Sequence, residues 1–412
     1  MAVTSKLINK GTRNLPKLSD AELKALDHIR KKGPLSRTSI AKLLGISRAS
    51  ITTIVGNLVD ADVLIEVGHG KSGGGRRPQL LDVNPEMGFV AGIDLGATSV
   101  DLALADFRGD ILTQKSFTAD VRSEPKILLE KINAIILDML AERSADASSL
   151  LGFGMGVPGP VQFDTGLLIQ PPLMPDWEGY PIKQFIRQQF PNTLPAIDND
   201  VNIMAIGEAR FGGGIGMDNF MYVKIGTGIG CGIISKGEIY RGSDGCAGDI
   251  GHICVDYNGP VCHCGNKGCL EFMAAGPAIA QRGILAARNG ESEKLEERVR
   301  AKGSQFNSKD IGELAAAGDR VANQIIYESG RMIGGVLAGL VNFYNPEAIF
   351  IGGGVSKIGH QFLSTIRQAT LKRATALSTR SLSIDYSKLG DDAGVHGALW
   401  LALDNVFAPS SN

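Results

Sequence analysis

The feature that most constrains the fold is a glycine-rich turn that recurs in two halves of the chain. The first turn, Asp94-Leu-Gly-Ala-Thr98, lies between apolar stretches at residues 89–95 and 99–106. The second lies in Lys224-Ile-Gly-Thr-Gly-Ile-Gly-Cys-Gly232. Each pattern predicts two antiparallel strands joined by a tight turn, and one alone is typical of an ordinary hairpin. Their repetition predicts two duplicated lobes with a cleft between them.

Both turns carry groups that can bind phosphate. Their backbone N–H groups and the Thr98 hydroxyl can hold phosphate oxygens, and Asp94 is available to a magnesium shell. A later apolar strand ends in Gly352-Gly-Gly354 before a predicted helix, where glycine permits close approach of phosphate or adenine. Together these features indicate the two-lobed α/β architecture of sugar kinases and actin-like ATPases. The candidate residues for magnesium ATP are Asp94, Gly96, Thr98, Gly226, Thr227, Gly228, Gly353 and Gly354.

All six cysteines fall within residues 231–269, which indicates a metal site rather than a distributed disulfide framework. The run Cys262-His-Cys-Gly-Asn-Lys-Gly-Cys269, with His252 upstream, provides four ligands for tetrahedral zinc. His263 is a competing ligand, but its position between two cysteines predicts an outward side chain. The predicted zinc ligands are His252, Cys262, Cys264 and Cys269, and the predicted buried small hydrophobes are Cys231, Cys246 and Cys254.

A cluster of carboxylates and amides follows a predicted strand at residues 194–197, in Ile197-Asp-Asn-Asp-Val-Asn202. Asn199 and Asp200 at this strand-to-helix junction are suited to bind sugar hydroxyls, and a carboxylate there can accept the proton of an attacking hydroxyl. The alternative is that these residues only cap the helix at residues 201–211.

The N-terminal region has the pattern of a helix-turn-helix unit. Residues 19–32 open with a capping-box-like start and predict one helix, and residues 36–44 predict a second with Ile40, Leu43 and Leu44 inward. Ser47 caps a third helix, whose buried stripe is Ile51, Ile54, Val55 and Leu58. The side chains available to base edges in the major groove are Ser47, Arg48, Ser50, Thr52 and Thr53.

A basic hairpin follows the third helix. Strands predicted at residues 63–67 and 79–83 flank a Gly-rich tip that contains Lys71, Arg76 and Arg77, the arrangement of a wing. These side chains would lie against phosphates or reach into the minor groove of operator DNA. The alternative is a generic three-helix unit with a loop, which this order of elements disfavours.

The charge distribution and the length of the chain both indicate a basic head followed by a separate body. Residues 1–80 carry 14 Lys and Arg against 6 Asp and Glu, whereas the rest carries 28 against 37, so the polyanion partner belongs to the head alone. At 412 residues the chain is too long for one ordinary core. No apolar run is long enough to span a bilayer, and the N-terminus lacks a signal-peptide pattern, so we expect a cytoplasmic location and no membrane partner.

The cysteine motif also carries a resemblance. Gly245-Cys-Ala-Gly-Asp-Ile-Gly-His252 with Cys262-His-Cys-Gly-Asn-Lys-Gly-Cys-Leu-Glu271 resembles the signature of the ROK family of repressors and sugar kinases. The resemblance covers the chain from about residue 89 to the C-terminus. The added winged helix resembles the repressor branch of that family, because its stand-alone kinases lack such a head.

The resemblance implies a sugar site. Asn199 and Asp200 would bind sugar hydroxyls, with Asp200 at the position of the kinase base, and Glu271 would also bind the sugar. His252 would bind zinc through one ring nitrogen and lean toward the sugar with the other. Asp249 replaces the family's usual Glu and is one methylene shorter, so its sugar contact is lost, mediated by water or suited to a different sugar.

These observations predict a winged helix-turn-helix domain at residues 18–84 followed by a two-lobed body. The first lobe is expected at residues 88–200, completed by a segment at about residues 380–412, and the second lobe at residues 201–380. Two functions stay open: a homo-oligomeric repressor, dimer or tetramer, that a monosaccharide or sugar derivative releases from DNA, and an ATP-dependent hexose kinase, with both functions able to coexist. We expect weak or absent phosphorylation, because a sensor works best without consuming its signal.

Overall fold

The computed structural model describes residue 16, residues 18–71 and residues 77–408. They form two compact units, the first drawn from the described residues up to 155 together with residues 179–197 and 398–408, and the second from residues 156–178 and 198–397. The chain therefore crosses between the units four times, after Met155, Glu178, Ile197 and Gly397. The second unit includes three segments that the sequence predicted to lie in the first lobe, namely residues 156–178, 198–200 and 380–397.

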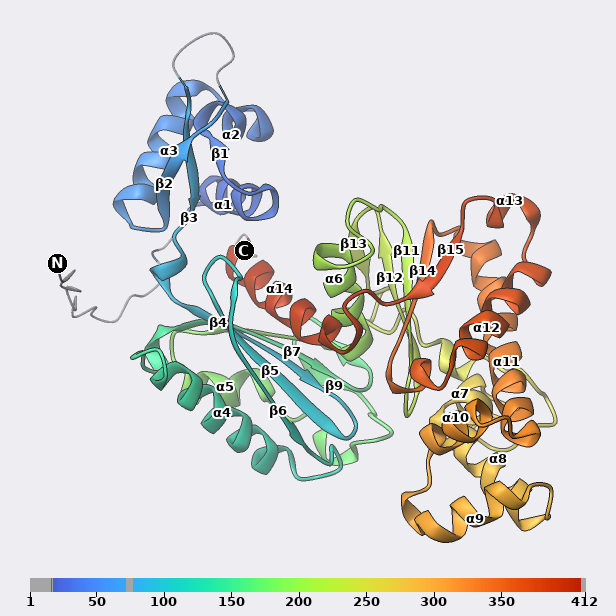
Figure 1. Cartoon of the computed structure of the whole chain (residues 1–412). Helices are drawn as coiled ribbons and strands as arrows, with labels where there is room; N and C mark the ends of the chain where they lie inside the picture. Colours follow the sequence, from blue (N-terminus) through green and yellow to red (C-terminus); the bar gives the residue numbers. More distant parts are fainter. Residues whose placement is uncertain (1–15, 17, 72–76, 409–412) are drawn as a thin grey trace, which may run out of the picture. The chain divides into compact units, whose positions relative to one another are not determined.

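A winged helix-turn-helix head opens the first unit (Figure 1). Its helices are α1 (Asp20–Lys32), α2 (Arg37–Leu44) and α3 (Arg48–Asp60). Its sheet has the order β1-β3-β2, with β1 (Leu35–Ser36), β3 (Gln79–Val83) and β2 (Leu64–His69). Ser19, Ser36 and Ser47 each cap a helix by accepting a backbone N–H from the first turn. The predicted order of three helices and two wing strands is confirmed.

The core of the head follows the predicted periodicity at four positions, whereas the predicted core residues Leu44 and Ile54 are half-buried. Ile40, Ile51, Val55 and Leu58 are buried. Leu43, however, is 37% exposed, so its predicted inward orientation is wrong. The buried face of the two-turn helix α2 is narrow, and Ile40 and Ala41 occupy it.

The body of the first unit is a five-stranded sheet in the order β10-β7-β4-β5-β6. Its strands are β4 (Phe89–Leu95), β5 (Ser99–Asp106), β6 (Ile111–Thr118), β7 (Leu150–Val157) and β10 (Leu194–Asn199). The helices of this unit are α4 (Pro125–Ala141), α5 (Ile182–Gln189), the short η1 (Pro85–Met87) and η2 (Ala147–Ser149), and most of α14 (Ala393–Phe407). A side chain at Gly154 would lie 1.9 Å from the Ala398 carbonyl oxygen, so glycine permits close packing of β7 on α14.

The first unit also contains a contact between α1 and α14. The Arg30 side chain is 1% exposed, lies 4.0 Å over the Trp400 ring and forms an ion pair with Asp404. A desolvated guanidinium over an aromatic face is a favourable cation–π arrangement. The DNA-binding head is therefore attached to the C-terminal helix as well as through the chain at residues 84–89.

The second unit contains a sheet in the order β13-β12-β11-β14-β15. Its strands are β11 (Phe220–Ile225), β12 (Ile229–Ser235), β13 (Glu238–Tyr240), β14 (Ala348–Gly352) and β15 (Ser383–Tyr386). A small hairpin of β8 (Val161–Gln162) and β9 (Leu167–Leu168), with η3 (Pro175–Trp177), belongs to the same unit. Strand residues alternate between two cores, with Met221, Val223 and Ile225 in one and Phe220 and Tyr222 in the other.

Helices cover both faces of this second sheet. The helix α6 (Asp200–Phe211) contributes Val201 and Ala205 to the core around Phe220. The larger core is made with helices that follow β13 in the sequence, together with β11 and β14. These later elements are η4 (Ile250–His252), α7 (Leu270–Ala274), α8 (Gly276–Arg288), α9 (Glu293–Lys302), η5 (Gly303–Gln305), α10 (Ser308–Ala316), α11 (Arg320–Tyr344), η6 (Gly354–Lys357), α12 (His360–Arg373), α13 (Ala376–Thr379) and η7 (Gly390–Asp392).

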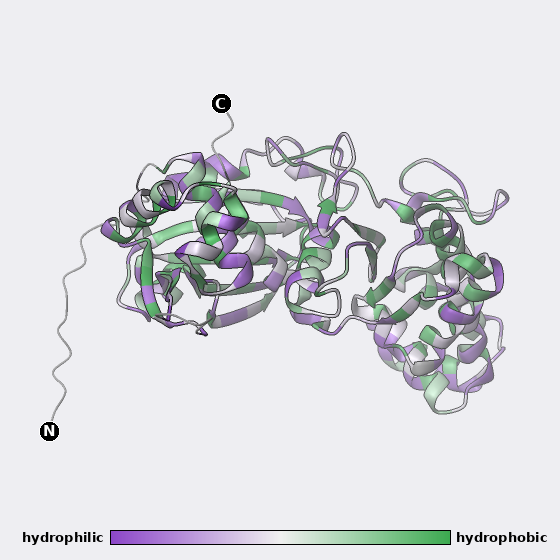
Figure 2. Cartoon of the chain, turned by 90° about the horizontal axis from the view of Figure 1, so that it is seen from above, coloured by the Kyte–Doolittle hydropathy of each residue, from purple (hydrophilic) through white to green (hydrophobic). Residues whose placement is uncertain are grey.

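The two five-stranded sheets have the same topology. In each, three antiparallel strands in a meander are followed by two further strands added beside the first. The predicted duplication is therefore confirmed, and the fold is the two-lobed α/β fold of sugar kinases and actin-like ATPases behind a winged head. Hydrophobic residues follow the sheet strands, whereas the helices carry both kinds of residue (Figure 2). Among the described residues, no helix is long and apolar enough to cross a membrane.

Candidate functional site

Four predicted metal ligands lie together in the second unit. His252 ends η4, Cys262 and Cys264 lie on the following loop, and Cys269 directly precedes α7. Their nitrogen and sulfur atoms all lie within 4.8 Å of one another. The Cys264 and Cys269 Sγ atoms are 3.7 Å apart, and Cys262 Sγ is 3.7 Å from His252 Nδ1. The four side chains converge on one point.

This spacing fits zinc. A tetrahedral ion with Zn–S bonds of about 2.3 Å places two thiolates about 3.8 Å apart, close to the 3.7 Å between Cys264 and Cys269. Three thiolates and one imidazole are also a donor set that zinc prefers. His263 lies outside the cluster, with its ring 5.6 Å from that of Phe272.

The loop geometry explains the glycines between the ligands. Cys262 N–H donates to the Asn266 carbonyl at 2.7 Å and closes a tight turn. Gly265 and Gly268 have φ angles of 88° and 64°, in the left-handed region that favours glycine. A side chain at Gly268 would also lie 1.7 Å from the Asp256 carbonyl oxygen.

The three thiols differ in proton affinity without the ion. A hydrogen bond from Asn266 N–H lowers the pKa of Cys264 to about 7, whereas burial raises the pKa of Cys269 to about 12. Burial also raises the pKa of Cys262. Because zinc binds thiolates, the ion must displace protons chiefly from Cys262 and Cys269.

The other cysteines follow the prediction in part. Cys231 is buried, and burial raises its pKa to about 12, as expected of an inert thiol. Cys246 and Cys254 are exposed, so the prediction that they are buried is wrong.

The predicted sugar residues Asn199 and Asp200 lie at the start of α6. Asn199 caps the helix: its Oδ1 accepts N–H from Val201 and Asn202, and its Nδ2 donates to the Gly159 carbonyl at 3.0 Å. The capping alternative therefore describes the Asn199 side chain as it stands. Asp200 follows as the first helical residue, with a side chain only 5% exposed.

Asp200 has a partner that the sequence interpretation missed. Lys224 Nζ forms an ion pair with Asp200 Oδ2, and the lysine side chain is 19% exposed. Lys224 is the second-last residue of β11 and lies two residues before the turn glycine Gly226. The sequence does show a lysine next to a predicted phosphate turn, which could have marked Lys224 as a candidate. It does not show the partner, because Asp200 is 24 residues away.

Asp249, His252 and Glu271 surround the other side of the metal loop. His252 Nε2 lies 3.8 Å from Asp249 Oδ1, so the ring nitrogen opposite the cysteines faces a carboxylate. Glu271 Oε2 accepts the Ile229 N–H at 3.0 Å. Glu271 therefore connects α7, next to the metal ligand Cys269, to the beginning of β12.

A second ion pair was also missed. Arg241 pairs with Asp198 at 2.7 Å and lies 3.7 Å over the Phe163 ring. Asp198 is 3% exposed and also accepts from Asn202 Nδ2. Arg241 thus fastens the loop after β8 to the strand end that carries Asn199. The separation of 43 residues leaves no local signal for this pair.

All five predicted sugar residues, Asn199, Asp200, Asp249, His252 and Glu271, belong to the second unit. The sequence suggested that they divide between both lobes. Asn199 and Asp200 instead come directly after the crossing at Ile197. Asn199 donates a hydrogen bond to the carbonyl of Gly159, which comes four residues after the crossing at Met155.

The predicted phosphate turns are present as hairpins. In the first unit Gly96 N–H donates to the Ser99 carbonyl at 2.8 Å, Thr98 is exposed, and Asp94 is 6% exposed on β4. In the second unit Gly226 N–H donates to the Gly228 carbonyl at 2.9 Å, and the Gly226 carbonyl accepts from Gly276 N–H. Thr227 occupies the tip of this turn.

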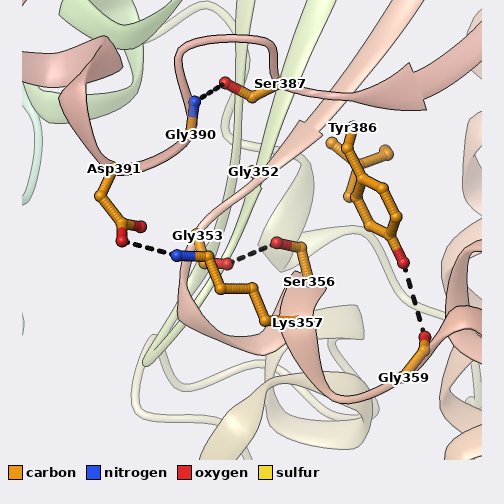
Figure 3. Close-up of a pocket in the computed structure, with 10 residues that line it drawn as sticks. Gly352, Gly353, Ser356, Lys357, Gly359, Tyr386, Ser387, Gly390 and Asp391 are labelled. Carbon is orange, nitrogen blue, oxygen red and sulfur yellow. Dashed lines mark hydrogen bonds and ion pairs between the residues drawn. The ribbon is translucent and has the colours of Figure 1, made fainter.

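Gly353 lines a pocket of about 200 Å³ at the ends of β14 and β15 (Figure 3). Lys357 and Asp391 form an ion pair of 2.5 Å there, and Ser387 Oγ accepts from Gly390 N–H. Gly354 begins η6, a single 3₁₀ turn, and α12 starts only at His360. The helix predicted after the glycines is therefore present as this short 3₁₀ turn.

The predicted DNA-contacting residues occupy one end of the head. Ser47, Arg48, Ser50, Thr52 and Thr53 are all exposed at the beginning of α3. Lys71 and Arg77 are exposed on either side of the wing tip. Arg76 lies outside the described residues.

Two family models match the chain. The one described as ROK family matches residues 90–405, more than half of the chain. The chain belongs to the ROK family. The other, described as winged helix-turn-helix DNA-binding, matches residues 18–65. This ROK protein therefore combines the family's two-lobed body with an N-terminal winged helix.

Relatives of two kinds resemble this ROK protein. It is 31% identical over 375 residues to a xylose repressor of Caldicellulosiruptor bescii, with 91% of this chain and 93% of that protein covered. It is 33% identical over 318 residues to a glucokinase of Halalkalibacterium halodurans, with 76% of this chain and 94% of that enzyme covered. A crystal structure described as a ROK family transcriptional regulator, homolog of the E. coli MLC protein, matches at a TM-score of 0.79 and 26% identity, covering 94% and 96% of the two chains.

Proposed function

We propose that this ROK protein is a transcriptional repressor that a monosaccharide or sugar derivative releases from its operator. The observation that carries the proposal is how much of this chain aligns with a repressor and how much with a kinase. The xylose repressor aligns over 91% of this chain, which includes head residues, whereas the glucokinase aligns over 76%. A kinase has no need of a DNA-binding head.

The head supplies the chemistry for operator binding. In this proposal Arg48 and its polar neighbours, which are exposed on α3, contact base edges, while the basic residues Lys71, Arg76 and Arg77 bind phosphates or the minor groove. Arg48→Ala should change sequence preference. Arg77→Ala should lower affinity for all sequences and reduce the salt dependence by roughly one phosphate contact. Unchanged affinity in both variants would refute these roles.

The sugar contacts the residues around the metal loop and the start of α6. Asp200, Asp249 and Glu271 offer carboxylate oxygens to hydroxyls, and His252 Nε2 offers a nitrogen on the side away from the cysteines. Zinc acts as a structural staple that fixes His252 and, through Cys269, the start of α7 with Glu271. No magnesium ATP chemistry is needed for this role.

Two residues of the proposed sugar site come directly after a point where the chain enters the second unit. Asn199 and Asp200 follow the crossing after Ile197, and α14, which carries the crossing after Gly397, contacts Arg30 of the head further along. A ligand that binds one arrangement better can shift the equilibrium by its differential affinity, and a coupling of about 1–3 kcal/mol weakens operator binding roughly 5- to 150-fold.

Repression by a winged head also calls for a homo-oligomer that matches two half-sites. One face of α11 suits a second copy of the chain: Phe343 is 88% exposed, and no atom lies within 4 Å of where a side chain at Gly339, one turn earlier, would begin. Phe343→Glu should shift sedimentation toward the monomer, whereas Leu285→Glu, at the 54% exposed Leu285 on α8, should not.

The decisive experiment measures operator affinity with and without sugars. Operator fragments are selected by the full chain from a random DNA pool, and a panel of neutral monosaccharides is screened by thermal shift, since a ligand of the native state raises Tm. A sugar that binds should release the DNA. If every binding sugar leaves operator affinity unchanged or tightens it, the inducible repressor is wrong.

A hexose kinase is the second candidate, alone or together with repression. Asp200, the Gly226–Gly228 turn and the similarity to a glucokinase favour it. A coupled assay that gives turnover within about 1–1,000 per second would promote this candidate. Asp200→Asn should then abolish turnover, because an amide cannot take the hydroxyl proton.

A further inference from the structure

We propose that Lys224 prevents Asp200 from acting as a proton acceptor, so that this site binds a sugar without phosphorylating it. The inference rests on the proposed function as a sugar sensor and names the residue that separates sensing from catalysis. It is carried by an ion pair between a lysine on β11 and the carboxylate at the kinase-base position.

The position of Lys224 links two parts that phosphoryl transfer needs. Its Cε lies 3.7 Å from the place where a side chain at Gly226 would begin, so the stem runs beside the predicted phosphate turn. Its ammonium then ends on Asp200 Oδ2. One side chain therefore extends from the turn that would hold a phosphate to the carboxylate that would take the proton.

The reaction that this arrangement opposes can be written in full. A sugar hydroxyl oxygen would bond to the γ-phosphorus of ATP, the bond from that phosphorus to the β–γ bridging oxygen would break, and ADP would leave. The hydroxyl proton would pass to Asp200. Lys224 Nζ donates to Asp200 Oδ2, so the ammonium occupies a position on that carboxylate oxygen from which it would otherwise take the hydroxyl proton.

The same ion pair leaves sugar recognition intact. Hydroxyl binding needs a fixed acceptor, and an ionised Asp200 held by Lys224 is such an acceptor. The lysine ammonium can also donate to a sugar oxygen, since it carries three N–H groups. A lysine that assists transfer would instead be directed at the phosphates, as the P-loop lysine is. Here Lys224 is directed at the base.

The turn on the other side of Lys224 is also engaged by a carboxylate. Glu271 Oε2 accepts the Ile229 N–H, and it lies 2.5 Å from the place where a side chain at Gly228 would begin. The Glu271 carboxylate against the backbone of this turn would repel a phosphate that binds there. Both parts of the second unit's transfer machinery therefore have partners within the chain.

The test compares full-length wild type with Lys224→Met, which removes the ammonium and keeps the stem, and with Lys224→Arg, which keeps the charge. Lys302→Met is the matched control, because Lys302 also approaches a buried carboxylate, that of Asp310, outside the site. Each protein is assayed for sugar binding by thermal shift, then for sugar-dependent ADP release and phosphosugar formation with magnesium ATP.

We expect sugar-dependent ADP release from wild type, Lys224→Arg and Lys302→Met to stay at one slow background rate. Lys224→Met should release ADP at least about tenfold faster than wild type, a barrier change of about 1.4 kcal/mol, and Lys224→Met with Asp200→Asn should return to background. If Lys224→Met is unfolded, Lys224→Gln replaces it. Sugar binding with ADP release no faster than wild type overturns the inference, and so does a wild type that turns over faster than Lys224→Met. Operator release by the wild type is measured separately, so failure of the repressor proposal is distinguished from failure of this one.

Discussion

The two glycine hairpins of this protein have the same position in their sheets but opposite charge at one equivalent residue. Asp94 is the second-last residue of β4, and Lys224 is the second-last residue of β11. Each is followed by one apolar residue and a glycine. The duplicated backbone is therefore retained, whereas the charge two residues before the turn glycine is negative in the first hairpin and positive in the second. Backbone geometry alone does not distinguish a sensor from a kinase.

The hairpins also differ in the contacts that hold them in place. Glu271 fastens the second hairpin to the helix that follows Cys269, and the metal cluster lies beside it. The first hairpin is held within its own sheet, where Gly96 N–H donates to Ser99. Changes around the metal should therefore disturb the second hairpin and leave the first intact.

Removal of zinc should have the largest effect. Cys264→Ser, or chelation of the wild type, should expose the second hairpin and the loop at residues 253–271 to hydrogen exchange, while β4 and β5 stay protected. Elemental analysis should find about one zinc per wild-type chain. A metal-free, fully folded preparation with full sugar affinity would contradict the site.

The same site predicts a pH dependence of metal loading. Burial raises the pKa of Cys262 and Cys269, so both thiols are protonated without zinc and release their protons when it binds. Zinc affinity should therefore rise with pH through the neutral range and fall as the solution is acidified. Competition with a chromophoric chelator at pH 6, 7 and 8 measures this, and equal affinity at all three would refute it.

Lys224→Asp should have the next largest effect, because it gives the second hairpin the charge of the first. The Asp200 carboxylate is 5% exposed and would face a like charge in place of its partner. Breaking a buried ion pair costs about 3–5 kcal/mol, and we expect a loss of this order in urea unfolding together with loss of sugar binding. Lys224→Arg should stay within about 1 kcal/mol of the wild type, since it keeps the pair.

Glu271→Gln should have a moderate effect. The amide oxygen can still accept the Ile229 N–H, but a hydrogen bond to a charged group, worth about 1.5–3 kcal/mol, becomes a neutral one of about 1 kcal/mol. Stability should fall by about 1 kcal/mol, and sugar affinity should fall as well. An unchanged Tm with unchanged sugar affinity would show that Glu271 does not link the hairpin to the sugar.

Asp94→Asn in the first hairpin should have the smallest effect on sensing. The amide keeps the shape of the side chain and one acceptor oxygen, so sugar-dependent release from DNA should stay within about twofold, less than 1 kcal/mol. A large loss of response would mean that the first turn binds a nucleotide needed for regulation. That result would favour the kinase candidate.

Much of the local structure could be predicted from the sequence. Ser19, Ser36 and Ser47 cap the helices of the head because a short hydroxyl satisfies an N–H of the first turn. The cluster that could hold a metal was also predictable, since Cys262, Cys264 and Cys269 lie on one short loop and glycines between them permit the turns. Leu43 was misjudged because helical periodicity does not say how wide the buried face is.

The sequence by itself determined the repeated hairpins, the metal loop and the head, because each depends on residues a few positions apart. Only the tertiary structure decided which charges meet: Lys224 with Asp200, and Arg241 with Asp198. It also decided that buried Glu208 of α6 accepts from Ser387, which is 179 residues later. The physical reason is that an ion pair needs its two groups within about 4 Å, and for residues far apart in sequence only the packing of strands and helices sets that distance.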